Sequence, residues 1–363
     1  MQKKPVDFPI LFTTLLLVAI GIVMVFSASF YYSQQRWGDS FYFFKRQLIW
    51  AGVGFLGMFV MSRVSYWKLQ KFSRLAVIIS ILLLTAVLFI GEERNNATRW
   101  LNIGGFTLQP SEVAKFSLIL FIADTISRSK DKIKSFFKGM LPILLVSGII
   151  FALILKQPNM STAGSIIILA FVMLFLGGAR MLYLGGFVGL GAAGAVVLVA
   201  TSEYRFKRFT AFMNPWADPL ETGWQVIQSL YSLGSGGLFG LGLAKSRQKL
   251  LYLPYPETDF IFAIVGEELG FIGAVALILL FLTLIWRGIK IAITAPDLFG
   301  SLLASGVIAM IAIQTIINIA VVTASMPPTG LPLPFISYGG SSLAIFLSSI
   351  GVLLNISRHC KTA

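Results

Sequence analysis

Four carboxylates lie close together at the start of one long apolar run. Glu257 and Asp259 precede the run, and the pair Glu267 and Glu268 lies within its first turns. A carboxylate in a suitable place can act as a general base towards a hydroxyl group. An ionised side chain within a membrane span costs about 2.5 to 3.5 kcal/mol unless it is paired or hydrated. We therefore expect compensating partners for Glu267 and Glu268, as structural or supporting groups.

Asp259 has two possible roles. Pro254 and Pro256 end any upstream helix, and Thr258 or Asp259 can cap the helix that follows. An N-cap contributes about 0.5 to 2 kcal/mol of stability and occurs at many helix starts. The alternative is a base at the membrane surface, and local spacing alone favours the cap.

A second charged group opens another apolar segment. Pro110 suits the first turn of a helix, and Glu112 and Lys115 share one face of that helix. Three interpretations follow: a self-contained pair with Glu112, a Lys115 that faces an anionic substrate, or a Lys115 that pairs with Glu267 or Glu268.

The elements that carry these residues are membrane spans. The chain is 56% hydrophobic and 12% charged, with a mean hydropathy of +0.84. Such values indicate an all-α polytopic integral membrane protein. We predict a single membrane domain over residues 1–363 and a large outer loop at about 201–258. The ten predicted spans are 8–30, 46–62, 73–90, 110–127, 139–156, 162–179, 181–200, 259–285, 298–324 and 339–357.

Lysine and arginine favour one set of short loops. These loops hold Lys3, Lys4, Arg63, Lys68, Lys71, Arg74, Arg128, Lys130, Lys132, Lys134, Lys138, Arg180, Arg287, Lys290, Arg358 and Lys361. Because cytoplasmic loops retain such residues, we predict that both tails, 1–7 and 358–363, are cytoplasmic. Loop topology and attraction to anionic membrane lipids then explain the net charge of +14, and no nucleic acid partner is expected.

Several kinds of chemistry are excluded by counting. The one histidine, His359, and the one cysteine, Cys360, lie in the predicted cytoplasmic tail. A Ser-His-Asp triad, a disulfide framework and a thiolate metal site are therefore excluded on the outer side. Acid or base chemistry there must use carboxylates.

The long outer loop contains two further patterns. Basic and aromatic residues alternate over 204–209, which suits anchoring at a membrane interface. Glycines recur over 234–242 and would let the backbone approach another surface closely. The following Lys245, Arg247 and Lys249 would suit a pyrophosphate, whereas the alternative is a flexible interfacial loop.

Several motifs together resemble a known family. They are Pro-Leu-Pro-Phe-Ile-Ser-Tyr-Gly-Gly-Ser-Ser at 332–342 with Ser337 and Gly339, Tyr252-Leu253-Pro254, Thr258-Asp259-Phe260-Ile261-Phe262-Ala263, Gly266-Glu267-Glu268-Leu269-Gly270, Arg99-Trp100, Gln109-Pro110-Ser111-Glu112 with Lys115, Gln157-Pro158, and Ser246 with Gln248-Lys249. Across the whole chain they resemble the SEDS proteins of bacterial shape, elongation, division and sporulation. The tract 318–323 is closer to the FtsW and SpoVE branch than to RodA.

The resemblance implies a ten-helix peptidoglycan glycosyltransferase of the bacterial cytoplasmic membrane. Such an enzyme polymerises lipid II on the outer face, together with a class B penicillin-binding protein and the division or sporulation machinery. The family's catalytic aspartate maps onto Asp259. Its basic residues for the lipid pyrophosphate map onto Lys115 and Arg99, and Gln248, Lys249 and Glu257 are further candidates for substrate binding.

This chain departs from the family pattern at one place. Relatives usually have a glutamate after the Leu-Pro pair, where this chain has Tyr255, and a glutamate stands instead at 257. Glu257 is therefore a candidate replacement for the missing acid. The outer carboxylates show no metal-ligand spacing, so no metal site is predicted, while Mg²⁺ or Mn²⁺ beside the pyrophosphate is left open. A lipid II flippase and a non-catalytic scaffold are the alternative functions.

Overall fold

Long helices form nearly the whole molecule. The computed structural model describes residues 5–94, 97–104 and 106–360, so that Lys3, Lys4 and Lys361, used above to orient the chain, lie outside the described residues. The long helices are α1 (Phe8–Trp37), α2 (Tyr42–Arg63), α4 (Ser73–Ile90), α5 (Pro110–Arg128), α6 (Leu141–Lys156), α7 (Met160–Leu176), α8 (Met181–Ala200), α11 (Ile261–Thr294), α12 (Leu298–Val322) and α13 (Gly340–Ser357). Each of the predicted spans overlaps one of them, and α1, α2 and α11 extend beyond their predicted spans.

Shorter elements connect these helices. They are α3 (Tyr66–Lys71), α9 (Glu203–Met213), α10 (Trp224–Ser235), the 3₁₀ turns η1 (Lys130–Lys134) and η3 (Pro215–Ala217), the π-helical turn η2 (Phe136–Met140), and the strands β1 (Glu92–Arg94), β2 (Ala97–Ile103) and β3 (Phe106–Leu108). The strands form an antiparallel sheet in the order β1-β2-β3. The expectation of a purely helical chain is corrected to this extent, because a connection outside the spans can pair its backbone as strands.

The polytopic membrane fold is confirmed. Within the described residues, seven helices are long and apolar enough to cross a membrane, and α7 is a shorter apolar helix. Helix α5 carries Glu112, Lys115 and Asp124, which lowers its hydropathy. The total number of crossings therefore stays a prediction.

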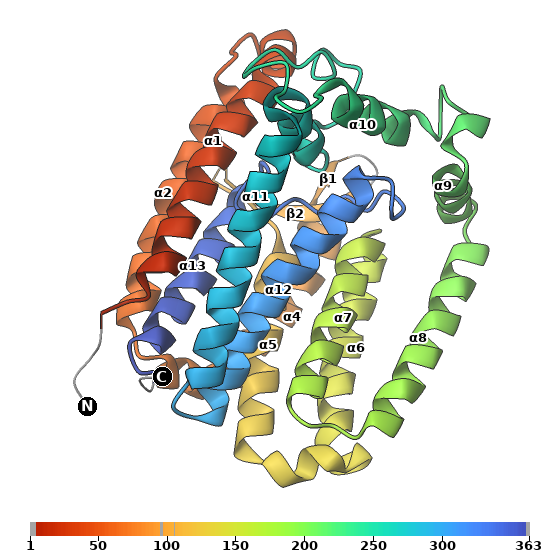
Figure 1. Ribbon diagram of the computed structural model, residues 1–363. Helices are drawn as coiled ribbons and strands as arrows, with labels where there is room; N and C mark the ends of the chain where they lie inside the picture. The colour runs from red at the N-terminus through yellow and green to blue at the C-terminus, as the bar shows by residue number, and fades with distance from the viewer. Residues whose placement is uncertain (1–4, 95–96, 105, 361–363) are drawn as a thin grey trace.

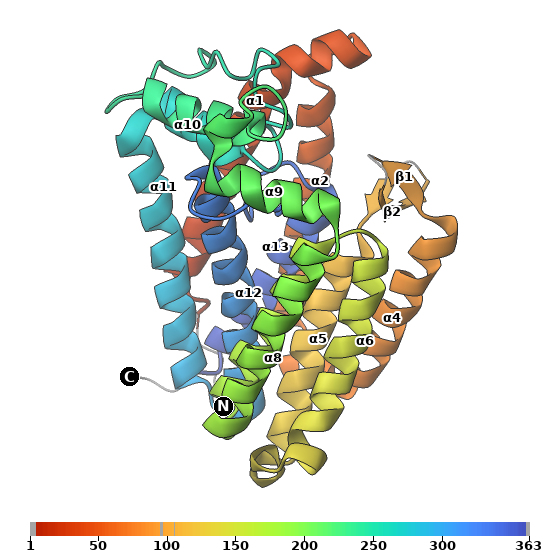
Figure 2. The ribbon, with the colours of Figure 1, turned by 90° about the vertical axis from the view of Figure 1, so that its right-hand side faces the viewer.

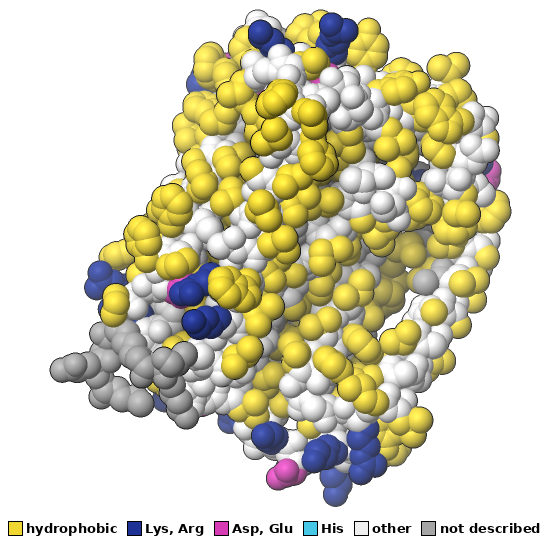
Figure 3. All heavy atoms as spheres, viewed as in Figure 1, with side chains coloured by type: hydrophobic (Ala, Val, Ile, Leu, Met, Phe, Trp, Pro, Cys, Tyr) yellow, Lys and Arg dark blue, Asp and Glu magenta, His cyan; other side chains and the backbone are white. Residues whose placement is uncertain are grey.

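The helices run side by side between two polar ends (Figures 1 and 2). Both termini and the α5–α6 connection lie at one end, called here the terminal end. The sheet, α9, α10 and the connection before α11 lie at the other end, called here the site end. Figure 3 shows a broad band of hydrophobic side chains between the ends and a group of Lys and Arg at the terminal end. This distribution suits a bundle that crosses a membrane.

Helices α12 and α13 form the buried centre of the bundle. Most of their residues are buried, and α13 packs closely on α2. A Cβ added to Gly351 would lie 2.3 Å from the carbonyl oxygen of Met58, so this helix pair needs a glycine at its contact. Helix α8, in contrast, is exposed along most of its length and stands apart from the bundle, which leaves the hollow visible in Figure 3.

Helix α11 is interrupted near its beginning. Gly270 has φ 70° and ψ −171°, outside the helical region. The residues before this break include Glu267 and Glu268, and the break faces the glycine-rich segment that follows α10. The kink therefore separates a short site-end turn from the long apolar remainder of the helix.

Candidate active site

Asp259 lies immediately before α11. The helix begins at Ile261, and its N-cap position is Phe260, with no side-chain capping bond. The N-cap interpretation of Thr258 and Asp259 is therefore wrong. Within the described part of the chain, no N–H or O–H group donates a hydrogen bond to the half-buried Asp259 carboxylate. Its oxygens are thus left for another partner.

The backbone on both sides of Asp259 is held firmly. Asn318 of α12 donates through Nδ2 to the carbonyl of Asp259 at 2.9 Å and to that of Leu331 at 2.8 Å. Ser337 donates to the carbonyl of Thr258 at 2.6 Å and accepts from the N–H of Leu333 at 2.8 Å. The proline-rich segment before α13 and the segment before α11 are therefore fastened to each other and to α12.

Gly339 and Gly330 have different roles in this segment. Gly339 occupies the N-cap position of α13, with extended φ of −179°. Gly330 has φ +75°, and a Cβ there would lie 3.4 Å from Oδ2 of Asp259. The second glycine therefore lets the backbone turn beside the carboxylate without covering it.

Two arginines act on the Asp259 carboxylate. Arg99 belongs to β2 and Arg208 belongs to α9. Burial raises the pKa of Asp259 to about 6, while the positive charges of Arg99 and Arg208 oppose that rise. At neutral pH Asp259 is therefore ionised in most molecules, as a general base requires.

A cavity of about 470 Å³ lies beside this group. Arg99 and Arg208 both line it, as do Thr329 and Leu331. Asp259 is not a lining residue itself, but its Oδ2 lies beside Gly330, the residue between Thr329 and Leu331. The remaining lining residues are Pro158, Asn159, Met160, Ser161, Gly164, Ser165, Ile168, Val199, Ser202, Phe209, Ile317, Met326, Pro327 and Pro328. The cavity thus combines two cations with apolar walls from α7, α8 and α12, and α9 crosses the end of α8 above it (Figure 2).

Arg99 is fastened to the turn between α6 and α7. Its guanidinium donates to the carbonyl of Gln157, with Nε at 3.3 Å, and to the carbonyl of Pro158. Arg208 donates to the carbonyl of Pro328 at 3.4 Å. Both cations are therefore directed towards the cavity from different elements.

Lys115 does not line this cavity. Its side chain is 1% exposed, and Nζ lies 2.8 Å from Oε1 of Glu112 and 2.7 Å from Oε1 of Gln314. The ammonium also lies 5.6 Å from the ring centroid of Phe346. The pair with Glu112 is thus confirmed, although it is not self-contained. Pairing with Glu267 or Glu268 is wrong, because α12 and α13 supply the other partners.

Hydrogen bonds connect Lys115 and Glu112 to the 332–342 segment, which supports Asp259. Gln314 donates through Nε2 to the carbonyl of Pro332 at 2.8 Å, and Ser342 donates to Oε2 of Glu112 at 3.3 Å. The charged pair therefore connects α5 to both ends of the 332–342 segment. In this structure Lys115 contacts Glu112 and Gln314, and a contact with the substrate stays a prediction.

Lys249 likewise has an internal partner. Its Nζ lies 2.8 Å from Oε1 of Glu268 and 3.1 Å from Oγ of Ser27 in α1. Glu268 also accepts from the backbone N–H groups of Ala244 and Ser246, at 3.0 and 3.2 Å. In this structure Lys249 compensates a buried carboxylate rather than lying free for a pyrophosphate.

Glu267 anchors the same segment. It accepts from the hydroxyls of Ser232 and Ser246, at 3.1 and 2.5 Å, and from the N–H of Arg247 at 2.9 Å. Compensating partners were expected for both glutamates, and both have them. They fasten the connection between α10 and α11 to the turn that precedes the Gly270 kink.

The glycine stretch approaches α11 closely, as predicted. A Cβ on Gly236 would lie 2.0 Å from the carbonyl oxygen of Gly266, and one on Gly240 would lie 2.2 Å from that of Glu268. The N–H groups of Leu241 and Gly242 donate to the carbonyls of Glu267 and Glu268, at 2.9 and 3.0 Å. Backbone hydrogen bonds to α11 thus use the N–H groups of Leu241 and Gly242.

Glu257 faces a second cavity. This cavity, of about 220 Å³, is lined by Tyr32, Lys249, Leu251, Leu253, Pro254, Tyr255, Pro256 and Glu257. Glu257 is buried, and its Oε2 has no hydrogen-bond partner among the described residues. Burial, and then the negative charge of Asp259, raise the pKa of Glu257 to about 7. Oε1 of Gln248 is also buried without a partner in the described part of the chain.

The candidate residues therefore separate into three groups. Arg99 lines the large cavity and acts electrostatically on Asp259, Glu257 and Lys249 line the smaller cavity, and Lys115 with Glu112 lies inside the bundle. Arg208, Gln314 and Asn318 were assigned no role from the sequence. A signal existed for each, since Gln314 and Asn318 are polar residues at helical spacing within a span and Arg208 lies in the basic and aromatic stretch.

The fold and the site define a polytopic membrane protein with a carboxylate and two arginines at a cavity on one end of its bundle. The chain belongs to the cell cycle protein family FtsW/RodA/SpoVE, whose sequence model matches residues 8–362. The resemblance to the SEDS proteins is thereby confirmed.

Two relatives match along nearly their whole length. Stage V sporulation protein E of Bacillus subtilis (strain 168) is 48% identical over 99% of both chains. A probable peptidoglycan glycosyltransferase FtsW of Geobacter sp. (strain M18) is 43% identical over 98% of both chains. These names agree with the predicted FtsW and SpoVE branch.

Two solved structures share the fold. The rod shape determining protein RodA of Thermus thermophilus superposes with a TM-score of 0.74 at 30% identity, covering 99% of this chain and 98% of that chain. A chain from work on structural coordination of polymerization and crosslinking by a peptidoglycan synthase complex superposes with a TM-score of 0.80 at 30% identity, covering 97% and 98%.

Proposed function

We propose that this protein is a peptidoglycan glycosyltransferase that polymerises lipid II. The observation that carries the proposal is the Asp259 carboxylate, which accepts no hydrogen bond among the described residues and feels the positive charges of Arg99 and Arg208, two cations that line a large, partly apolar cavity. The relatives that carry the name peptidoglycan glycosyltransferase support it.

The reaction needs one base and a cationic site. The Asp259 carboxylate accepts the proton of the acceptor sugar hydroxyl as that oxygen bonds to the anomeric carbon of the donor. The bond from this carbon to the lipid pyrophosphate breaks, and the leaving oxygen retains the electron pair. Arg99 and Arg208 offset the charge on the pyrophosphate, and the apolar walls of the cavity receive the lipid. Asp259 thus serves the acceptor hydroxyl, and the two arginines serve the leaving pyrophosphate.

The smaller cavity suits the glycan. Its lining residues include Glu257, whose Oε2 has no hydrogen-bond partner among the described residues, and two aromatic residues, Tyr32 and Tyr255, of a kind that can cover a sugar face. Since Glu257 and Asp259 lie two residues apart, the two cavities flank one backbone segment. Within the described residues, no group of three His, Cys, Asp or Glu converges on a metal position.

Replacement of Asp259 tests the assignment. Asp259→Asn removes the base, and we expect purified protein to lose about 10²- to 10⁴-fold in lipid II polymerisation rate. The matched control is Asp218→Asn, since Asp218 is half-buried like Asp259 and its carboxylate accepts from the N–H and the hydroxyl of Thr222 in its own turn. Full polymerisation by the Asp259 variant would contradict the proposal. Transport of lipid II without polymerisation would favour a flippase, and activity only through an added enzyme would favour a scaffold.

We further propose how the protein lies in its membrane. It resides in the bacterial cytoplasmic membrane, with both termini inside, because the terminal end holds the basic loops (Figure 3). A class B penicillin-binding protein of the division or sporulation machinery is the proposed partner, supported by the similar chain from a peptidoglycan synthase complex.

A further inference from the structure

The terminal end contains a pocket that the proposed reaction does not use. The pocket measures about 160 Å³ and lies where α4 begins and α5 ends, closed by η1 and η2. Its lining residues are Arg74, Thr125, Ile126, Arg128, Ser129, Lys132, Ile133, Lys138 and Gly139. It has room for about five water-sized groups.

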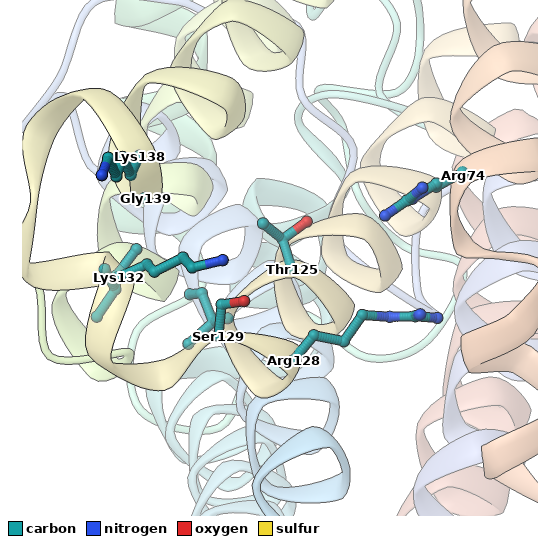
Figure 4. Close-up of a pocket in the computed structure, with 9 residues that line it drawn as sticks. Arg74, Thr125, Arg128, Ser129, Lys132, Lys138 and Gly139 are labelled. Atoms are coloured by element: carbon teal, nitrogen blue, oxygen red, sulfur yellow. The ribbon is translucent and has the colours of Figure 1, made fainter.

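The pocket is strongly cationic. Four of its lining side chains are cations, and two are hydroxyls. Figure 4 shows the Lys132 ammonium pointing towards the Thr125 and Ser129 hydroxyls, with the Arg74 and Arg128 guanidinium groups on the other side of these residues. Guanidinium, ammonium and hydroxyl donors together match the oxygens of a phosphate group.

The nearby carboxylates leave most of this charge uncompensated. Asp124 is buried, where it accepts from the hydroxyl of Ser73 at 2.7 Å and from Nε of Arg128 at 2.6 Å. Asp131 lies in η1. Within the described residues, Arg74, Lys132 and Lys138 form no ion pair. An anion in this pocket would therefore meet three cations without a carboxylate partner.

The connection that closes the pocket has a defined shape. The N–H of Lys132 donates to the carbonyl of Ser129 at 3.0 Å, and the carbonyl of Lys132 accepts from the N–H of Ser135 at 2.9 Å. Gly139 packs against this turn, because a Cβ there would lie 2.1 Å from the carbonyl oxygen of Lys132. The cations thus surround a built cavity rather than a loosely charged loop.

The surroundings of the pocket favour a lipid over a soluble anion. Phe137, next to Lys138, is 75% exposed. Beyond Arg74, helix α4 presents exposed Leu75, Ile78 and Leu82 at helical spacing. An acyl chain can lie on this apolar face while its headgroup phosphate occupies the pocket. We propose that this pocket binds the headgroup phosphate of an anionic membrane phospholipid.

Two double variants with equal loss of charge test the proposal. In Arg74→Gln with Lys132→Gln, both changed residues line the pocket, whereas in Lys130→Gln with Lys134→Gln, both belong to η1 but lie outside it. All four residues are exposed, so the fold should tolerate either variant. Native mass spectrometry of the full-length protein would measure the binding of phosphatidylglycerol and, for comparison, phosphatidylcholine.

We expect the pocket variant to bind phosphatidylglycerol about 10- to 30-fold more weakly than the unmodified protein. The η1 control should keep its affinity within about twofold, and phosphatidylcholine should show no dependence on either pair. An equal loss in both variants would overturn the proposal in favour of diffuse surface attraction. Binding of inorganic phosphate through Arg74 and Lys132, without preference for phosphatidylglycerol, would overturn the lipid assignment.

Discussion

At the scale of residues, the environment of Asp259 decides its chemistry. Its carboxylate has lost part of its hydration but has gained no hydrogen-bond donor among the described residues. The positive charges of Arg99 and Arg208 therefore oppose the effect of burial on the pKa of Asp259 and favour its ionised form. The raised pKa also means that folding favours the protonated form, so the Asp259 contribution makes the native state less stable as pH rises from about 4 to 6. A carboxylate that lowers the stability of the native state when it ionises suits a functional role better than a structural one.

The pH dependence of polymerisation follows from the same carboxylate. Because the base must be ionised, we expect the rate to fall as pH decreases through about 6. Arg208→Ala removes a cation that lowers the Asp259 pKa, so the acidic limb should move to higher pH and kcat/KM should fall by about tenfold or more. The control is Lys207→Ala, an exposed cation of α9 paired with Glu203. An unmoved acidic limb in the Arg208 variant would contradict this role.

At the scale of elements, buried ionic groups hold the site segments together. Glu267 and Glu268 fasten the α10–α11 connection, whereas Glu112 and Lys115 fasten the 332–342 segment through Ser342 and Gln314. Removal of one partner from such a pair leaves an uncompensated charge in a medium of low polarity. These pairs therefore specify how the elements meet.

A second-site change can distinguish a positioning role for Lys115 from a substrate contact. Lys115→Met should destabilise the protein by about 3 to 5 kcal/mol and lower kcat, because Glu112 is left buried and unpaired. Glu112→Gln in the same chain should restore most of the thermal stability and part of kcat. The contrary outcome is a double variant that regains stability but shows a KM for lipid II above that of the unmodified protein. That result would mean that Lys115 contacts the pyrophosphate and would contradict a purely positioning role.

At the scale of the whole molecule, α8 stands apart and leaves the large cavity between it and the bundle (Figure 1). We expect such an opening to give a long apolar chain a lateral path from the bilayer towards the site end. The polar part of a lipid-linked sugar would meet Arg99 and Arg208 at the site end.

Filling the cavity tests this path. Gly164 of α7 lines it, and a Cβ there meets nothing within 4 Å, so Gly164→Phe should fold normally and occupy the space. We expect KM for lipid II to rise by about tenfold, as the loss of about 1.4 kcal/mol in binding would produce. Gly185→Phe on α8 is the control, because a Cβ at Gly185 is also unhindered and this residue lies outside the cavity lining. Equal KM values in the two variants would exclude the path.

The orientation of the molecule is a separate prediction. A green fluorescent protein joined after Ala363 should fluoresce, because this reporter folds in the cytoplasm when the C-terminus lies there. An alkaline phosphatase joined within the 201–258 segment should be active outside. The reverse result in both fusions would place the cavity on the inner side of the membrane.

The sequence by itself determined the membrane class, the helical spans and the family. Apolar runs of spanning length and the distribution of Lys and Arg are local properties, so they need no tertiary contact to be recognised. The candidate residues, including Asp259, Glu267 and Lys115, were also visible, since charge is rare in such segments.

Only the tertiary structure decided which way these side chains face. The sequence left the partner of Lys115 open and presented Lys249 as a cation for a pyrophosphate, yet each is paired inside the fold, with Glu112 and Glu268. Arg208, distant in sequence, instead joins Arg99 at the Asp259 carboxylate. Pairing depends on which elements the bundle brings together, and helix starts such as that of α11 depend on tertiary hydrogen bonds to the preceding segment. Spacing along the chain specifies neither of these.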